Sequence, residues 1–324
     1  MKIISDDIRT SEQCAFIAAV RSDGIASAQE WLESVRRGRD LSRPAPVILM
    51  PEDGAKALRI RPTSHGEWQN VSLRDGVFTL YNSMADTSYE YVTDTGEGGI
   101  LHTAASEFRF IFADNVSNIR DLGGRELKPG MVYRGAALET LLPDSPYGAD
   151  MLSSLGIRTE IDMRGECLGK YVRSVLGDGV CYMPIPYRPY DEAFLPQHKE
   201  RLREIFDVFA DESRYPIYFH CMGGADRTGM VAMFLELLIG EREEDVYLDY
   251  ELTSLSLIPA LDSETVAPHR SRESDYFREF LDEMRAYSPK GTLRDCVLLY
   301  LADCGISDET LDKIIKILKK EQNN

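Results

Sequence analysis

The sequence predicts an α/β protein, in which a domain with a mainly parallel sheet flanked by helices follows a smaller β-sandwich. Residues 44–113 contain short candidate strands separated by turn dipeptides, which is typical of an antiparallel sandwich. From Asp114 onward, candidate strands alternate with helical stretches, and this alternation indicates a parallel sheet. Beyond Gly240 the apolar residues recur at helical spacing. We therefore expect three segments: a helical one at 1–43, a β-sandwich at 44–113 and an α/β domain at 114–324.

The first segment is predicted to hold a short amphipathic helix. Ser27 and Glu30 have the spacing of a capping box, and Gly38 would end the helix. Three apolar side chains would form one of its faces: Trp31, Leu32 and Val35. We expect this face to dock on the same chain, and the alternative is that it binds a partner.

The second segment should form the strands of the sandwich. Its candidate strands are 47–50, 58–61, 71–73, 77–81, 88–93 and 108–112. The stretch 84–91 resembles the corner of fibronectin type III modules, in which a tyrosine hydroxyl bonds back to the chain. Such modules act as spacers, as docking surfaces or as part of a substrate entrance. We expect no chemistry here, with His65 and His102 as surface loop residues rather than ligands.

The third segment should place its ligand at the carboxyl ends of its parallel strands. Candidate strands lie at 131–134, 158–163, 180–185 and 216–220, and candidate helices at 197–210, 243–255, 274–287, 293–303 and 308–320. Ser307 is the expected N-cap of the last helix. Residues 256–272 lack periodicity, so a lid or binding loop is one interpretation of them.

A ten-residue loop separates a short apolar strand at 215–219 from an apolar helix at 230–239. It reads His220-Cys221-Met222-Gly223-Gly224-Ala225-Asp226-Arg227-Thr228-Gly229. A strand, a glycine-bearing loop and a helix in this order make an anion site, because loop amides and the helix N-terminus both favour negative charge.

The residue types in this loop suit phosphoryl chemistry. A cysteine at a helix N-terminus beside a cation ionises readily, so Cys221 is a candidate nucleophile. The guanidinium of Arg227 offers paired donors to phosphate oxygens. Gly223 and Gly224 let backbone amides approach a phosphate, and the Thr228 hydroxyl can stabilise the thiolate.

Two other interpretations fail on context. Cys167 also has an arginine six residues later, Arg173, but 176–179 is turn chemistry and no apolar helix follows. A nucleotide-binding loop at 224–229 would need a lysine where Met230 stands.

The pattern His-Cys-x5-Arg-Thr-Gly resembles the signature of the cysteine-based protein tyrosine phosphatase superfamily. It is most similar to the bacterial tyrosine/serine protein phosphatases, whose loop usually reads His-Cys-x-Ala-Gly-Lys-Asp-Arg-Thr-Gly. Further stretches agree with that family over roughly 114–324: 118–124, 127–130, 132–136, 161–164 and 249–253. Two departures are Gly223 for alanine and Ala225 for lysine. The lysine meets extra phosphate charge in relatives, so we expect phosphotyrosine or a small aryl phosphate as substrate, with inositol phosphates or phosphoinositides as the alternative.

The resemblance implies hydrolysis through a phosphocysteine. Cys221 would attack phosphorus, while Arg227 and the amides around Met222, Gly223, Gly224 and Ala225 hold the oxygens. Asp226 is the favoured general acid, and Asp191, thirty residues upstream, is the competitor.

The roles of the remaining polar residues are less direct. We expect His220 to position the thiolate by hydrogen bonding. Asp162 and Arg164 either orient the substrate or Arg227, or form a buried ion pair at a strand end, and we favour the ion pair. Arg120 and Asp121 are expected to be structural.

Composition limits the partners. The net charge of −17 argues against nucleic acid and anionic membranes. Six cysteines without a Cys-x-x-Cys pair suggest neither a zinc site nor disulfides, and the chemistry needs no metal or cofactor. No apolar run reaches transmembrane length, and Asp6 and Asp7 are unlike a signal peptide, so we expect a cytoplasmic protein.

The competing function is that of a catalytically inactive module that binds a phosphorylated ligand. We disfavour it because the cysteine, the arginine and the acid of the loop are all present. Oligomeric state is not predictable from these features.

Overall fold

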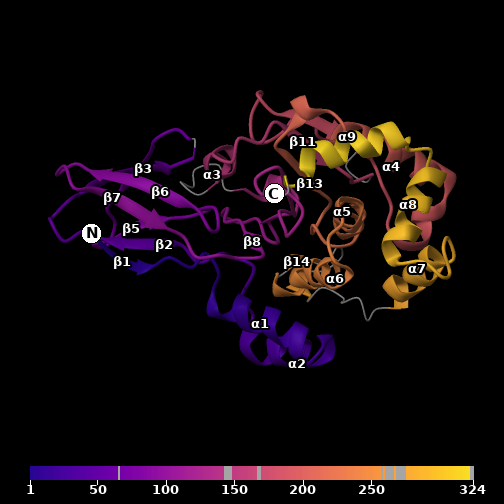
Figure 1. The fold of residues 1–324 in the computed structure, drawn as a ribbon, viewed down its shortest axis with the longest axis horizontal. Coiled ribbons are helices and arrows are strands. Elements are labelled where there is room, and N and C mark those ends of the chain that lie inside the picture. The colour runs from indigo at the N-terminus through magenta and orange to yellow at the C-terminus, as the bar shows by residue number, and fades with distance from the viewer. Residues whose placement is uncertain are drawn as a thin grey trace.

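The computed structural model describes residues 1–64, 66–141, 148–165, 169–256, 258–259, 266–267 and 275–321. A β domain lies at one end of the molecule, an α/β body at the other, and a pair of helices packs beneath the body (Figure 1). His65, Cys167 and most of the lid interpreted at 256–272 lie outside the described residues, where only the short pair β14 (Ile258–Pro259) and β15 (Val266–Ala267) is placed. No helix in the described ranges is long and apolar enough to cross a membrane.

The body is built on a six-stranded sheet in the order β12-β11-β13-β10-β9-β8. Its strands are β8 (Arg109–Phe110), β9 (Arg120–Asp121), β10 (Val132–Gly135), β11 (Thr159–Asp162), β12 (Cys181–Pro184) and β13 (Ile217–His220). Strands β10 to β13 pair in parallel, whereas β8 and β9 add antiparallel strands at one edge. The predicted mainly parallel sheet is confirmed. The stretch 108–112, expected in the sandwich, instead pairs with β9 in this sheet.

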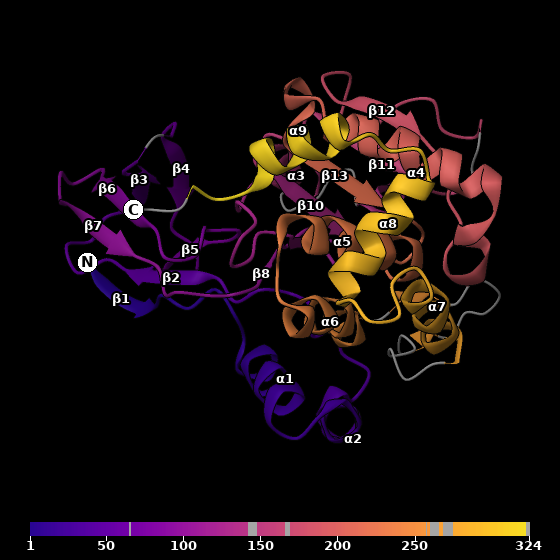
Figure 2. The same cartoon turned by 45° about the vertical axis from the view of Figure 1, so that its right-hand side comes forward.

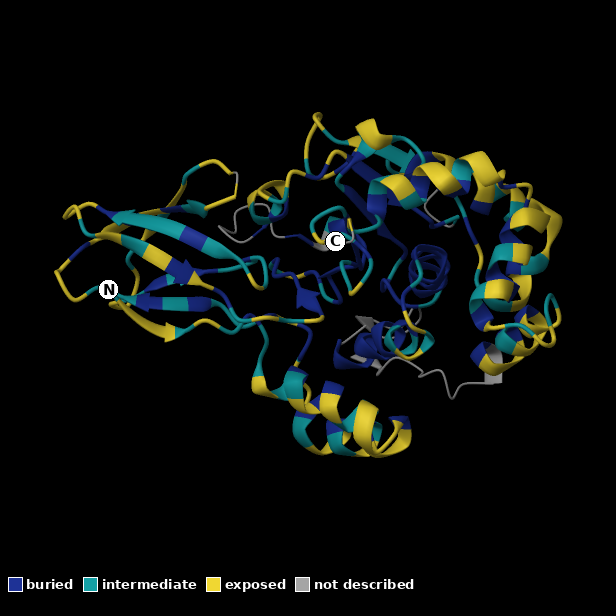
Figure 3. Cartoon of the chain, in the orientation of Figure 1, coloured by how far each residue is buried: buried dark blue, intermediate teal, exposed yellow. Residues whose placement is uncertain are grey.

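Helices surround the sheet, and α5 is the central one (Figure 2). They are α3 (Ala149–Ser153), α4 (Pro196–Phe209), α5 (Asp226–Ile239), α6 (Glu243–Leu252), α7 (Asp275–Arg285), α8 (Leu293–Asp303) and α9 (Asp308–Leu318). Short 3-10 turns connect them: η1 (Leu138–Thr140), η2 (Tyr190–Phe194), η3 (Glu212–Arg214) and η4 (Thr253–Leu255). Helix α5 contacts β10, β13, α6, α8 and α9, and it is buried along almost its whole length (Figure 3). Ser307 caps α9 through its hydroxyl, as predicted.

The β domain consists of two antiparallel sheets, ordered β1-β2-β5 and β4-β3-β6-β7. Their strands are β1 (Lys2–Ser5), β2 (Val47–Met50), β3 (Ala57–Pro62), β4 (Gln69–Ser72), β5 (Phe78–Leu80), β6 (Ser88–Thr93) and β7 (Gly98–His102). Both sheets contribute to one hydrophobic cluster, with Leu49 from one and Leu58 from the other. The hydroxyl of Tyr89 accepts a hydrogen bond from the Met84 amide at 2.7 Å, which is the expected corner contact. The fibronectin likeness itself stays a prediction.

The first segment differs from the expected single helix. Lys2–Ser5 forms β1, and two helices follow, α1 (Ser11–Ser22) and α2 (Ile25–Arg36). The capping box is formed by Thr10 and Gln13 at α1, so the one predicted at Ser27 and Glu30 is wrong, because both residues lie inside α2. The predicted docking is confirmed: this helical hairpin shares a buried cluster with α6 and η4.

A buried arginine joins the β domain to the body. Arg109 on β8 pairs with Asp121 at 2.8 Å and donates to the carbonyl oxygens of Asn82 and Ser83 at 2.5 and 3.0 Å. Asp121 also accepts from the amides of Gly123 and Gly130. Asp121 is therefore structural, as expected.

Candidate active site

The predicted loop leaves the carboxyl end of the central strand β13. His220 ends this strand, opposite Gly135 on one neighbour and Asp162 on the other. Cys221 follows at once and is 4% exposed. Helix α5 begins at Asp226, four residues earlier than expected, so Asp226, Arg227 and Thr228 form its first turn. Cys221 and Arg227, the candidate nucleophile and the cation, thus lie at the two ends of a loop on a helix N-terminus.

The loop conformation requires a glycine at position 224. Gly224 has φ of +66°, and a Cβ there would lie 2.3 Å from the carbonyl carbon and oxygen of Gly135. Both the left-handed conformation and the close backbone approach exclude larger residues. The second glycine of the Gly223-Gly224 pair therefore has a local steric cause.

Side chains behind the loop hold its carbonyl groups. Asn118 Nδ2 donates to the oxygens of Gly223 and Gly224 at 2.9 and 3.0 Å, and Arg134 Nη2 donates to Gly224 O at 2.9 Å. The Met222 carbonyl accepts from the Ala137 amide at 3.0 Å. Within the described chain, the amides of residues 222–225 donate no hydrogen bond. Free amides on a loop whose carbonyls are fixed are the arrangement of an anion site.

A buried ion triad supports these contacts. Arg120 and Arg134 are fully buried and share the carboxylate of Asp249 on α6, with Arg120 Nε at 2.7 Å and Arg134 Nη1 also bonded. Arg120 also donates to Asn118 Oδ1. Burial opposes ionisation of Asp249, but the two guanidinium groups outweigh it and lower its pKa. Burial, with repulsion from Arg134, lowers the pKa of Arg120 to about 10. Arg120 is structural, as expected.

His220 bonds the backbone of Cys221 rather than its sulfur, which differs from the expected hydrogen bond to the thiolate. Its Nδ1 bonds the Cys221 carbonyl at 3.0 Å, and its Nε2 lies 2.9 Å from Glu160 Oε1. Burial lowers the pKa of this imidazole, but the carboxylate of Glu160 outweighs burial and raises it. A cationic imidazole donates from both nitrogens, which matches the two acceptors present.

The remaining residues of the first turn face different partners. Arg227 is 8% exposed, and its Nη1 lies 3.4 Å from the Met163 carbonyl oxygen. The buried Thr228 hydroxyl has no hydrogen-bond partner among the described residues, and Cys221 is no exception. Asp226 is half-buried and accepts a hydrogen bond from the Tyr190 hydroxyl at Oδ1.

The other predicted residues lie outside the loop itself, although Asp162 lies opposite His220 in the sheet. Asp191 follows Tyr190 in η2, and its side chain is exposed. Asp162 accepts from Arg164 at 2.7 and 2.8 Å and from the Tyr182 hydroxyl at 2.6 Å, while Arg164 also pairs with Glu139. Burial opposes ionisation, yet pairing raises the pKa of Arg164 and lowers that of Asp162. This arrangement fits the favoured buried ion pair at a strand end.

Several residues around the loop escaped the sequence reasoning. Asn118 and Arg134 lie in stretches that matched the phosphatase pattern, so that match was the available signal. Tyr190 and Tyr250 contact one another near Asp226, but their proximity depends on tertiary packing that no spacing reveals.

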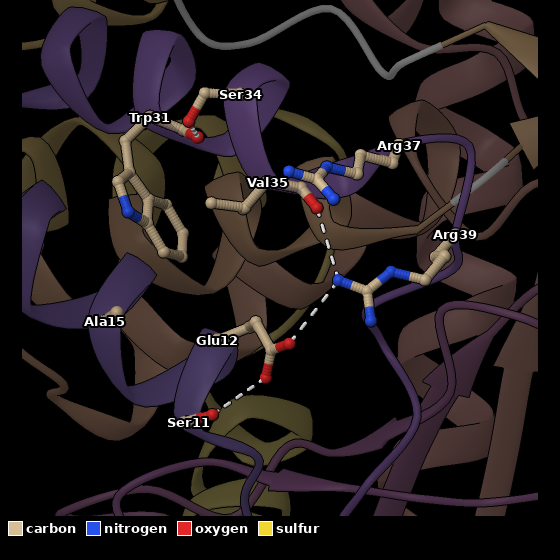
Figure 4. Close-up of a pocket in the computed structure, with 8 residues that line it drawn as sticks. All are labelled: Ser11, Glu12, Ala15, Trp31, Ser34, Val35, Arg37 and Arg39. Atoms are coloured by element: carbon tan, nitrogen blue, oxygen red, sulfur yellow. Dashed lines mark hydrogen bonds and ion pairs between the residues drawn. The ribbon is translucent and has the colours of Figure 1, made fainter.

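A pocket of about 720 Å³ lies on the helical hairpin, where Arg39 bonds Glu12 and the Val35 carbonyl near Trp31 (Figure 4). His102, expected in a loop, is exposed on strand β7 and bonds Asp86. In the described part of the chain no group of three His, Cys, Asp or Glu side chains is placed to hold a metal, and the described cysteines are free thiols.

Comparison with known proteins gives a family and several similar chains. The model of a family described as "Tyrosine phosphatase family" matches residues 111–169 and 177–320. A protein of Cupriavidus necator, provisionally named a tyrosine-protein phosphatase, is 25% identical over 169 residues, covering 42% of this chain and 60% of its own.

Two solved structures are also similar, each at 14% identity. The core catalytic domain of the PP-IP phosphatase SIW14 from S. cerevisiae, in complex with citrate, aligns with a TM-score of 0.33 over 56% of this chain and 94% of its own. OH1 from the Orf virus, a tyrosine phosphatase with triple substrate specificity, aligns with a TM-score of 0.24 over 64% of this chain and 86% of its own.

Proposed function

The chain belongs to the tyrosine phosphatase family, and on this premise we propose that it hydrolyses phosphate monoesters, most readily protein phosphotyrosine, through a phosphocysteine intermediate. The observation that carries this proposal is the loop 221–227. Its carbonyls at 222–224 are held by Asn118, Arg134 and Ala137, while the amides of residues 222–225 donate no hydrogen bond within the described chain.

A phosphate monoester dianion suits this loop. Its oxygens can accept from the free amides, and the positive end of the α5 dipole adds attraction. The planar guanidinium of Arg227 can bind two oxygens together, both in the substrate and in the transition state. The acidic net charge of the chain does not oppose this, because the local field is set by the loop.

The reaction takes two displacements at phosphorus. In the first, the Cys221 thiolate forms a sulfur–phosphorus bond as the ester oxygen–phosphorus bond breaks, and Asp226 gives its proton to the departing oxygen. In the second, water attacks phosphorus, Asp226 takes a proton from it, and the sulfur–phosphorus bond breaks. Inorganic phosphate leaves and Cys221 returns to a thiolate. His220 and Thr228 act on the nucleophile: one holds its backbone, and the other has a hydroxyl available to its sulfur.

The choice of Asp226 over Asp191 rests on placement. Asp226 is part of the loop helix and is held by Tyr190. Asp191 projects from η2 as an exposed side chain. Loss of the general acid should slow turnover by about 10²–10⁴.

The preference for phosphotyrosine rests on Ala225. A lysine at this position would add a cation for substrates with more than one phosphate, and alanine supplies none. We therefore place inositol phosphates and phosphoinositides second.

Hydrolysis of p-nitrophenyl phosphate tests the proposal, with Cys221→Ser as the matched control. We expect turnover by the wild type and none by C221S, whereas equal product release from both proteins would remove the enzymatic function. A panel of phosphotyrosine peptide, phosphoserine peptide and inositol hexakisphosphate then tests the substrate class. Faster turnover of the inositol phosphate would overturn the preference for phosphotyrosine while leaving the reaction in place.

A further inference from the structure

Tyr190 is attached to helix α5 at two points. Its hydroxyl donates to Asp226 Oδ1, and its backbone amide donates to Met230 Sδ at 3.0 Å. Asp226 and Met230 are four residues apart and therefore lie on one face of the helix. Tyr190 thus packs along the face that carries the candidate acid.

The backbone of Tyr190 is in an unfavourable conformation. Its φ of +60° is rare for a residue with a Cβ, and especially for an aromatic one. Such a conformation persists where surrounding contacts fix it, and it is concentrated at functional sites. The two contacts with α5 supply that constraint.

A second tyrosine, Tyr250, contacts the hydroxyl of Tyr190. The hydroxyl oxygens of Tyr190 and Tyr250 are 2.8 Å apart. Because the Tyr190 proton is directed to Asp226, Tyr250 must donate to Tyr190. Burial is the main cause that raises the pKa of both phenols, so both remain neutral donors. The two hydroxyls form a chain that ends on the carboxyl group.

Gly229 makes room for this chain. A Cβ at Gly229 would lie 2.8 Å from two ring carbons of Tyr250. The glycine that closes the Arg-Thr-Gly motif therefore lets the Tyr250 ring reach the first turn of α5. Asp226, Glu251 and Arg134 are among the charged groups that act on Tyr250.

We propose that Tyr190 is a positioning residue for the general acid Asp226, and that Tyr250 orients Tyr190. This inference rests on the proposed function. The Tyr190 hydroxyl occupies Oδ1, whereas Oδ2 accepts no hydrogen bond within the described chain and is the oxygen that exchanges the proton.

The pH dependence of kcat/KM for p-nitrophenyl phosphate tests this inference. The alkaline limb of the profile reports the loss of the proton from the general acid. In Tyr190→Phe we expect this limb to move to higher pH, because the variant loses the hydroxyl that donates to Asp226 Oδ1 and so favours its ionised form. Tyr250→Phe should move the alkaline limb in the same direction, but by a smaller amount. If Y190F fails to fold, the Tyr250→Phe variant alone tests the inference.

Leaving-group dependence gives a second measurement. Phenol is a poorer leaving group than p-nitrophenol, so hydrolysis of phenyl phosphate depends more strongly on the general acid. We therefore expect Y190F to lose roughly tenfold more activity on phenyl phosphate than on p-nitrophenyl phosphate. This loss is smaller than the one expected when the acid itself is removed. Tyr215→Phe is the matched control. Its buried hydroxyl bonds the Phe209 carbonyl, and it precedes β13, at the opposite end of the strand from Cys221. We expect its profile to match the wild type.

The outcomes separate the two proposals. If Asp226→Asn removes the alkaline limb while Y190F and Y250F leave it in place, the positioning role is wrong and the phosphatase function stands. If Asp191→Asn removes the limb instead, Asp226 is not the acid and the inference is again overturned. Absence of turnover by the wild type defeats the proposed function itself.

Discussion

Asp249 stands at the centre of the interactions that hold the candidate active-site loop. It pairs with Arg120 and Arg134, and these in turn bond Asn118 and the Gly224 carbonyl. All three charges of the triad are buried. A buried ion pair adds little over an apolar replacement of the whole set, but the removal of one partner leaves the others uncompensated. We therefore expect a substitution at Asp249, a single residue on α6, to affect both the stability and the loop geometry.

Asp249→Asn should lower the free energy of unfolding by about 3–5 kcal/mol, because two guanidinium groups stay buried without a counter-charge. Urea unfolding measures this. Asp178→Asn is the control. Asp178 pairs with Arg173 at 3.5 Å, but their side chains are 88% and 77% exposed, so the substitution should change the free energy of unfolding by less than about 1 kcal/mol. Equal effects of the two variants would contradict the triad's role.

The contribution of Glu236 to the free energy of unfolding changes with pH in the opposite direction to that of Asp249. Burial, followed by repulsion from Asp249, raises the pKa of this α5 carboxyl well above its ordinary value. The folded chain therefore keeps a proton that the unfolded chain releases above pH of about 4.3. Since the folded state then binds more protons, stability falls as pH rises, by at most about 1.4 kcal/mol per pH unit.

Glu236→Gln should remove this fall. The unfolding free energy of the variant relative to wild type should increase between pH 5 and pH 8, as measured by urea unfolding at each pH. Glu200→Gln, on the exposed face of α4, should run parallel to the wild type. Parallel curves for E236Q as well would show that Glu236 is ionised in the folded protein.

At the scale of elements, the loop between β13 and α5 is specified by backbone geometry as much as by side chains. Gly224 lies against Gly135 of the neighbouring strand β10, so the loop and the sheet edge approach too closely for any Cβ. Helix α5 then begins directly, with its first turn at the site and the rest buried in the body. Because α5 is buried in the body, its packing fixes the position of Arg227.

Gly224→Ala should abolish turnover and weaken vanadate binding, because the added Cβ would collide with Gly135 backbone at 2.3 Å. Gly156→Ala isolates the conformational part of this effect. Its φ of +71° is similarly left-handed, but a Cβ there meets no atom within 4 Å. We expect G156A to lose only about 1 kcal/mol of stability and to keep its activity. Normal vanadate affinity in G224A would contradict the close approach.

Elements with strong local signals were predictable, and those that depend on distant partners were not. Helix α8 and strands β2 and β6 lie at the predicted positions, because periodicity and turn residues define them. Strand β7 is absent from the predicted strands, because it begins with two glycines and its pairing with β6 is what makes it a strand. The loop residues from Cys221 to Thr228 were identified from spacing and resemblance, and their catalytic roles stay predictions. The contacts of Tyr190 had no local signal at all.

At the scale of the whole molecule, the helical hairpin and the β domain both pack on the α/β body. The hairpin shares a core with α6, and the hydroxyl of Ser42, in the segment that follows α2, accepts from the Asn118 amide at 3.1 Å. Asn118 holds the loop carbonyls, so the N-terminal segment reaches the site through one intermediate residue. Arg109 on β8 joins the β domain to the body through its hydrogen bond to the Ser83 carbonyl. Sequence reasoning predicted the docking but not this connection.

Leu32→Ala should destabilise the protein by about 2–5 kcal/mol, because Leu32 is 1% exposed in the cluster between the hairpin and α6. Leu299→Ala, at a site 49% exposed on α8, should cost less than about 1 kcal/mol. Calorimetry of both variants checks this. A Leu32 variant as stable as the Leu299 variant would mean that the hairpin contributes no core.

Trapping the covalent intermediate tests the central claim most directly. Wild-type protein is mixed with excess p-nitrophenyl phosphate, quenched with acid within one turnover, digested and analysed by mass spectrometry. We predict a phosphoryl group on the peptide that contains Cys221, and its absence when the same sample is prepared from C221S. Steady turnover with an unmodified Cys221 peptide, matched by turnover in C221S, would contradict the account.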